Sequence, residues 1–202
     1  MRMDVEEIGD MLDIDICFNA IMDQYKNVLR LLWGKPRQVM MKGIDWSKKV
    51  CQVMVPDKYD LVITSAGGFP KDINFYQAQK AITNACMICK DGAEIILAAE
   101  CREGAGNQRF LQFMQGKHTF SEVIDEFSHI PFEIGPHKAY LLARQGLKYG
   151  ISLKSSMDEG VVQAMLMTPL TSLQCALDNF EVSSGRKIAV LPYGGLTVPN
   201  LG

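Results

Sequence analysis

The residues best suited to chemistry in this sequence are gathered in the stretch TSAGGFPKDINFYQAQKA, residues 64–81. Gln77 and Lys80 are spaced i, i+3, so they share one face if this stretch is helical. One amide and one ammonium on a common face could orient a small anionic substrate. Gly67 and Gly68, just upstream, allow the backbone to turn tightly and to approach a ligand closely. The stretch therefore predicts a binding site for a small anion.

A helix that starts here would add to such a site, because its first N–H groups and the positive end of its dipole suit a carboxylate or phosphate. The apolar run DLVIT (60–64) predicts a strand, and INFYQAQKAITNACMICK (73–90) predicts a helix with Asp72 as its N-cap. The pattern recurs, because the strand-like EIILAA (94–99) is followed by the Gly-rich ECREGAGNQRF (100–110). If both strands are parallel, both loops open on the same sheet edge, which favours a site there.

Each of these features also has a purely structural interpretation. Gly-rich turns often serve only geometry, and a lysine on a helix is usually solvated. GAGNQR carries only part of the dinucleotide-binding fingerprint, because Arg109 stands where the third glycine would be. A nucleotide site is therefore not predicted, and both interpretations of the Gly-rich loops stay open on the sequence alone.

Cysteine and histidine spacing does not predict a metal site. Cys86 and Cys89 form a CxxC, but no second pair exists, and the pair lies near the end of a predicted helix instead of at its start, where a redox thiolate is stabilised. The histidines are too far apart for a metal motif: His118, His129 and His137. His137 follows Pro136 near a predicted helix start, where it could face the same cleft or serve only structure.

Composition excludes several classes of function. The net charge is −2 and the pI is about 5.9, so the basic footprint of a nucleic-acid-binding protein is absent. No apolar run reaches the ~18 residues of a transmembrane helix, and the acidic start MRMDVEEIGD is not a signal peptide. Six scattered cysteines are typical of reduced thiols, which predicts a cytoplasmic protein without membrane or nucleic-acid partners.

The elements that must position the candidate residues change character near Pro56. Upstream, the pattern predicts a helix (4–12), a hairpin of two strands (15–22 and 27–33) and a second helix (39–55). Downstream, short apolar strands alternate with helices. The remaining predicted elements are strands at 149–155 and 187–193 and helices at 107–115, 121–128, 137–147, 157–166 and 171–180. This pattern predicts an α/β fold, a mainly parallel sheet with helices on both faces, preceded by a small α+β segment with a hairpin.

Several long motifs resemble one known family. SAGGFPKDINFYQAQKA (65–81) closely resembles the carboxyl-terminal part of the nickel-dependent lactate racemase family, and AAECREGAGNQRF (98–110) is a second matching block. GPHKAYLLAR (135–144), the tail AVLPYGGLTVPNLG (189–202) and the start MRMDVEEIGDMLDIDICFN also resemble this family, so that the resemblance covers essentially the whole chain.

The resemblance implies a two-domain enzyme with its active site between the domains. It implies a nickel pincer cofactor derived from nicotinic acid and attached to a lysine of the amino-terminal domain, which exchanges a hydride with C2 of a 2-hydroxy acid while two histidines of that domain act as acid and base. Tyr76, Gln77 and Lys80 match the family's substrate-side residues. His137 falls near a position where the lactate enzyme has a tryptophan, which leaves open which 2-hydroxy acid is used.

The same resemblance places the cofactor lysine, the nickel histidine and the catalytic histidines upstream of Met1. The chain is thus expected to be a carboxyl-terminal portion, with residues 1–56 as the tail end of the amino-terminal domain and 57–202 as the carboxyl-terminal α/β domain. It is expected to be inactive and without the nickel pincer nucleotide on its own, with the missing amino-terminal domain as partner. The alternative hypothesis is a non-catalytic α/β module that binds a small carboxylate or a partner protein. The reading frame upstream of Met1 would separate the two hypotheses.

Overall fold

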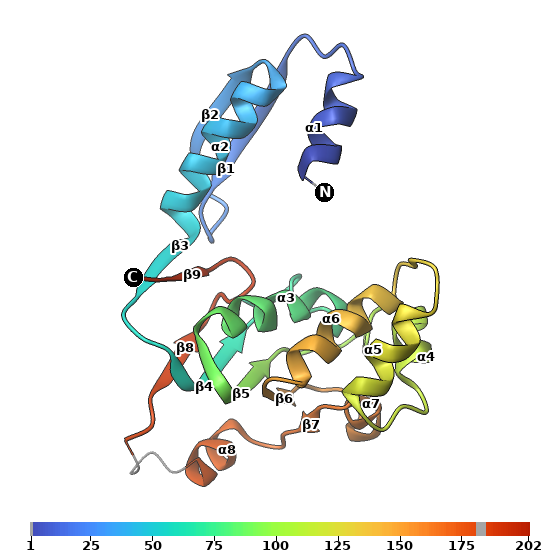
Figure 1. Ribbon diagram of the computed structural model, residues 1–202. Helices are drawn as coiled ribbons and strands as arrows, with labels where there is room; N and C mark the ends of the chain where they lie inside the picture. The colour runs from blue at the N-terminus through green and yellow to red at the C-terminus, as the bar shows by residue number, and fades with distance from the viewer. Residues whose placement is uncertain (1, 181–184) are drawn as a thin grey trace. The chain divides into compact units, whose positions relative to one another are not determined.

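A computed structural model describes residues 2–180 and 185–202 of the chain (Figure 1). The chain divides into two compact units, Met1–Gln52 and Val53–Gly202. Each unit is described by itself below.

The first unit is a helix followed by a hairpin and a second helix. α1 spans Arg2–Asp10, β1 Cys17–Met22, β2 Val28–Gly34 and α2 Pro36–Cys51. β1 and β2 pair antiparallel, and the Asp23 carboxylate closes their turn by accepting hydrogen bonds from the backbone N–H groups of Tyr25 and Asn27. α2 lies on one face of this hairpin, where Gly43 is buried beside Leu32 and Ile21.

The second unit is built on a five-stranded parallel sheet in the order β7-β6-β5-β4-β8. Its strands are β4 (Tyr59–Ser65), β5 (Cys89–Ala98), β6 (Gly150–Lys154), β7 (Thr168–Pro169) and β8 (Ile188–Leu191). Its helices are α3 (Phe75–Ala85), α4 (Gln108–Met114), α5 (Phe120–Ser128), α6 (Pro136–Gly146), α7 (Glu159–Ala164) and α8 (Leu173–Asn179). β3 (Gln52–Val55) and β9 (Val198–Leu201) form a separate two-stranded sheet.

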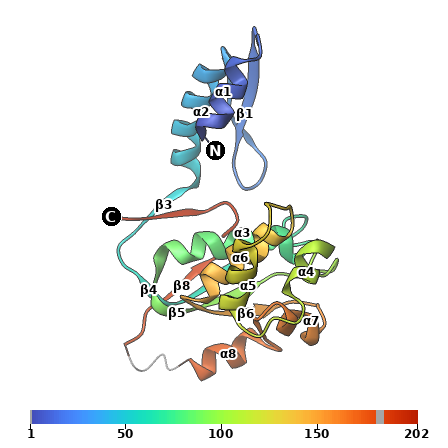
Figure 2. The same ribbon diagram turned by 45° about the vertical axis from the view of Figure 1, so that its right-hand side comes forward.

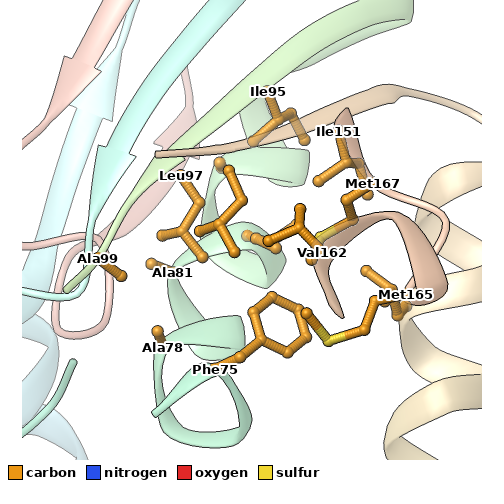
Figure 3. Close-up of a cluster of buried hydrophobic side chains, with 14 of the residues drawn as sticks. Phe75, Ala78, Ala81, Ile95, Leu97, Ala99, Ile151, Val162, Met165 and Met167 are labelled. Atoms are coloured by element: carbon orange, nitrogen blue, oxygen red, sulfur yellow. The ribbon is translucent and has the colours of Figure 1, made fainter. Parts of the chain in front are cut away.

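Helices cover both faces of the parallel sheet, because the apolar side chains of the strands point both ways. α3 and α6 lie over one face and α8 lies on the other (Figures 1 and 2). In the larger core, Phe75 of α3 packs with Leu97 of β5 and with Val162 and Met165 of the α7 region (Figure 3). The smaller core on the α8 side is formed by Leu61, Ile96 and Phe180, with further side chains from α8 packed against it.

These observations confirm the predicted fold class, an α/β fold with a parallel sheet and a preceding hairpin. Three element predictions are wrong. The helix predicted over 39–55 ends at Cys51, and Gln52–Val55 form β3 instead. The helix predicted over 73–90 ends at Ala85 and passes through a 3₁₀ turn into β5, which begins at Cys89 because Cys89 pairs with Tyr59 of β4. The strand predicted over 187–193 is not the last one, since β9 follows it.

Within the described part of the chain, no helix is both long enough and apolar enough to cross a bilayer.

Candidate functional site

The two Gly-rich loops meet at the carboxyl edge of the parallel sheet, as the sequence predicts, but they bond to each other there. The backbone N–H groups of Phe75 and Tyr76 donate to the carbonyls of Gly104 and Ala105 at 3.0 and 3.1 Å. The next N–H of α3, that of Gln77, donates to the Asn74 side chain at 3.0 Å. The first donors of α3 are therefore occupied, and the expectation that this helix start binds an anion through free N–H groups is wrong.

Asn74, not Asp72, caps α3. Asp72 lies two residues earlier and joins the loops: its backbone carbonyl accepts from Cys101 N–H at 2.8 Å, and its carboxylate faces Glu100 N–H at 3.4 Å. Its other carboxylate oxygen is buried without a hydrogen-bond partner among the described residues. Because Asp72 is engaged by the second loop, α3 begins two residues later than the sequence predicts, at Phe75, and Asn74 is its N-cap.

The glycine pair at the end of β4 serves two different purposes. Gly67 has φ +91°, and a Cβ there would lie 3.0 Å from Cδ1 of Tyr193. Gly68 has φ +76° with open space around it, so that only its backbone conformation requires glycine. Gly67 is thus explained by packing against the segment that follows β8.

That segment, Tyr193 to Gly195, fills the place where open α/β sheets commonly bind ligands. β4 lies between β5 and β8, so the direction of strand addition reverses beside it. Gly194 N–H donates to the Ser65 carbonyl at 2.8 Å, and Asn84 Nδ2 donates to the Gly194 carbonyl at 2.6 Å. A Cβ at Gly194 would overlap Thr64 Oγ1. The Gly194-Gly195 pair was the sequence signal for this close approach.

The structure brings four of the six predicted site residues together, on α3 and at the start of α6. Lys80 Nζ donates to Gln77 Oε1 at 3.1 Å on the exposed side of α3. The rings of Tyr76 and His137 meet edge to face, with centroids 6.3 Å apart. A residue that the sequence did not single out, Lys138, joins them: its Nζ lies 5.1 Å from the centroid of the Tyr76 ring.

This group, hereafter the lysine cluster (Tyr76, Gln77, Lys80, His137 and Lys138), is positively charged. Burial, and then the neighbouring Lys80 ammonium, lower the pKa of Lys138 from its ordinary value. Across the described residues, neither ammonium has a carboxylate within 4.0 Å. The arrangement can attract an anion and donate several hydrogen bonds to it. The signal that could have found Lys138 was its place next to His137.

The two cysteines of the CxxC are placed for packing and not for redox chemistry. Burial raises the pKa of the Cys86 and Cys89 thiols to about 12, so both are protonated at neutral pH. The residues in ranges 2–180 and 185–202 include no group of three or more histidine, cysteine, aspartate or glutamate side chains arranged to hold a metal ion.

Comparison with known proteins shows which family the chain belongs to. The sequence model of the family described as "Lactate racemase C-terminal domain" matches residues 54–198. A lactate racemase of Thermoanaerobacterium thermosaccharolyticum is 32% identical over 182 residues, which are 87% of this chain and 42% of that protein. A lactate racemase of Lactiplantibacillus plantarum is 27% identical over 182 residues, again 87% of this chain and 43% of the other.

Solved structures agree with this match. The structure of the lactate racemase apoprotein from Thermoanaerobacterium thermosaccharolyticum is similar with a TM-score of 0.91 and 27% identity, over 98% of this chain and 48% of that one. A protein from Thermotoga maritima, 11% identical with a TM-score of 0.67, shares the fold alone. The chain spans less than half the length of the curated relatives that it matches. By its sequence match and its architecture, the chain belongs to the lactate racemase C-terminal domain family.

Proposed function

We propose that the chain is the substrate-side part of a nickel-pincer-dependent enzyme that racemises or epimerises a 2-hydroxy acid. The observation that carries this proposal is the lysine cluster, in which the family-matching residues Tyr76, Gln77 and Lys80 lie beside His137. A small carboxylate is the ligand that an exposed ammonium and a neighbouring amide on one helix face suit best.

Each residue of the cluster has a role in this proposal. Lys80 donates to the substrate carboxylate, and the 3.1 Å bond to Gln77 Oε1 holds its ammonium in place until the substrate arrives. Gln77 then orients the substrate through its amide. Tyr76 and His137 form an aromatic wall, and their edge-to-face contact sets the size of the space beside C2. By the family resemblance, the nickel pincer supplies the hydride chemistry when it is bound to the amino-terminal domain.

We also propose that the first unit belongs to that amino-terminal domain, with a boundary near residue 56. One face of the hairpin is apolar and exposed: Phe18 lies opposite Trp33, with exposed fractions of 64% and 70%, and Ala20 lies opposite Leu31. α2 covers the other face. An apolar sheet face of this kind is typical of a surface that further polypeptide covers. The relatives are more than twice as long, which supports a covering domain.

The test is a lysine substitution in the complete enzyme, assembled from this chain, the amino-terminal half of a relative and the cofactor. A charge-assisted hydrogen bond contributes about 1.5–3 kcal/mol, so Lys80→Ala should lower kcat/KM roughly ten- to a few hundred-fold. Lys148→Ala, which removes an exposed lysine after α6, is the matched control. Wild-type kcat/KM in Lys80→Ala would refute the proposed role of Lys80.

A second expectation concerns the chain alone. Because the resemblance assigns the hydride acceptor and the acid and base to the amino-terminal domain, the isolated chain should not racemise lactate. Purified chain that contains stoichiometric nickel and racemises D-lactate would contradict the proposed division of labour. A cytoplasmic location belongs to the same proposal, supported by six cysteines that are all free.

A further inference from the structure

Two ammonium groups from different helices belong to the lysine cluster, and one of them contacts an aromatic ring. Lys138 of α6 lies over the ring of Tyr76, with its Nζ 5.1 Å from the ring centroid. Lys80 follows Tyr76 by one turn of α3, so its side chain rises from the same helix face. Lys138 is half-buried and Lys80 is exposed. The Lys138 ammonium therefore contacts the ring of Tyr76, and Lys80 is close enough to act on it as a second positive charge.

Three other lysines of this unit are paired with acids. Such pairs join Lys90 to Asp60, Lys117 to Glu126 and Lys187 to Asp57. Glu133, the carboxylate nearest to Lys138 in sequence, faces Arg109 instead, with 3.6 Å between the charged atoms. Neither lysine of the cluster has such an acid partner among the described residues, and the charge that acts on Lys138 is the like charge of Lys80.

Such an arrangement is unfavourable while the site is empty. Partial burial removes water from the Lys138 ammonium, and the Lys80 ammonium repels it, so both effects lower the pKa of Lys138. An anion that contacts both groups would reverse both effects. Unbalanced charge of this kind in a candidate site is a sign of ligand binding more than of stability.

We propose that Lys138 is a specificity-determining residue that binds a second negative charge of the substrate, and that the preferred 2-hydroxy acid is a dianion such as a 2-hydroxydicarboxylate. The inference rests on the proposed function, in which Lys80 binds the carboxylate next to C2. A monocarboxylate held by Lys80 leaves the Lys138 charge uncompensated, whereas a dianion neutralises both. Gln77 holds the Lys80 ammonium at 3.1 Å and the Tyr76 ring contacts the Lys138 ammonium, so that the two groups, held by different partners, suit two anionic groups.

The experiment is a binding titration of the full 202-residue chain, followed through the NMR signals of isotope-labelled lysine side chains. The probes are DL-malate, DL-lactate and succinate, which carry two charges with a 2-hydroxyl, one charge with a 2-hydroxyl, and two charges without it. Malate should bind about tenfold more tightly than lactate, the effect of one additional accessible ion pair. Added salt should reduce this preference, because such charges are screened.

Four variants separate charge from structure. Lys138→Met should reduce the preference for malate over lactate to less than about twofold, while Lys138→Arg, which keeps the charge, should retain most of it. Lys80→Met should weaken malate and lactate alike. Lys148→Met is the matched control and should leave both affinities unchanged. The Lys138 pKa should rise when malate binds and not when it is added to Lys80→Met.

The outcomes distinguish this inference from the proposed function. Equal affinity for lactate and malate, or an equal loss of both in Lys138→Met, overturns the dianion inference and leaves the role of Lys80 intact. Succinate binding as tightly as malate supports the charge preference but contradicts a requirement for the 2-hydroxyl, and so counts against the proposed function. Failure of all three probes to bind overturns the inference, and the kcat/KM of Lys80→Ala then decides the proposed function separately.

Discussion

Asn74 fixes the start of α3, and through it the position of Gln77 and Lys80. Its Oδ1 accepts from Gln77 N–H at 3.0 Å, and its side chain packs against Gly106 of the neighbouring loop. One side chain thus satisfies a helix donor and sets the distance between the two loops. A substitution that shifts the start of α3 at Asn74 should therefore also shift Gln77, which lies within the first turn of the helix.

Replacing Asn74 by alanine should destabilise the second unit. Loss of an N-cap side chain costs about 0.5–2 kcal/mol, which lowers Tm by a few degrees in a domain of this size. Asn74→Asp keeps an acceptor at the cap and should retain most of the stability. Thermal unfolding followed by circular dichroism measures the difference. An equal Tm for Asn74→Ala and Asn74→Asp would show that the cap bond contributes nothing.

Thiol reactivity should follow burial. Burial raises the pKa of the Cys86, Cys89 and Cys101 thiols to about 12, so almost no thiolate forms at pH 8, whereas Cys175 is exposed. Iodoacetamide at pH 8 should therefore label Cys175 first in the folded chain and leave the other three unlabelled until urea is added. Peptide mass spectrometry checks this order. Rapid labelling of Cys86 or Cys89 in the folded chain would revive a redox role for the CxxC.

At the level of elements, the two βα loops act as one unit. The first N–H groups of α3 donate to Gly104 and Ala105, and the backbone between Asp72 and Cys101 is joined by a 2.8 Å bond. Glycines in the second loop permit this contact, both by adopting a left-handed backbone and, at one position, by leaving room for a side chain of the first loop. Gly104 and Gly106 both have positive φ, +65° and +78°, but only Gly106 lies against the Asn74 side chain.

This difference gives a matched pair of substitutions. Gly104→Ala should cost about 1–2 kcal/mol, the strain of a left-handed backbone, because nothing lies within 4 Å of the added Cβ. Gly106→Ala adds the same strain and an overlap with Asn74, so its loss of unfolding free energy should be larger by at least about 1 kcal/mol. Urea unfolding of both variants measures this. Equal losses of unfolding free energy in the two variants would mean that the loops move apart to relieve the overlap with Asn74 at no cost.

For the whole molecule, the main feature is the apolar hairpin face of the first unit, which the described residues of that unit leave uncovered. Phe18, Trp33 and Leu31 lie on it with exposed fractions of 64%, 70% and 48%. A contiguous apolar patch on an isolated chain promotes association and dye binding. This patch is the observation on which the proposal of a covering polypeptide rests.

The double variant Phe18→Ser/Trp33→Ser should bind less of the dye ANS and elute as a smaller species in size-exclusion chromatography. Its unfolding free energy should change by less than about 0.5 kcal/mol, because both side chains are exposed. Leu147→Ser, which removes a single exposed leucine of the second unit, is the control and should change neither measurement. ANS fluorescence that is the same in the double variant and in the wild type would argue against the hairpin face as a docking surface.

The sequence by itself determined the fold class and the family. Short apolar runs alternating with helices predicted the parallel sheet, and the motif SAGGFPKDINFYQAQKA with its companions predicted the lactate racemase family, because both signals are local and repeated along the chain. The substrate roles of Tyr76, Gln77, Lys80 and His137 stay predictions, although the structure brings these residues together.

Only the tertiary structure decided which groups remain available for a ligand. From sequence, the start of α3 has free donors and Asp72 can cap it, but both inferences fail because a distant loop supplies the partners. Likewise, β9 exists only because it pairs with β3, and Lys138 joins Lys80 only because α6 packs beside α3. Hydrogen bonds and charges between segments far apart in the chain leave no periodic trace in the sequence, so their outcome depends on the folded arrangement.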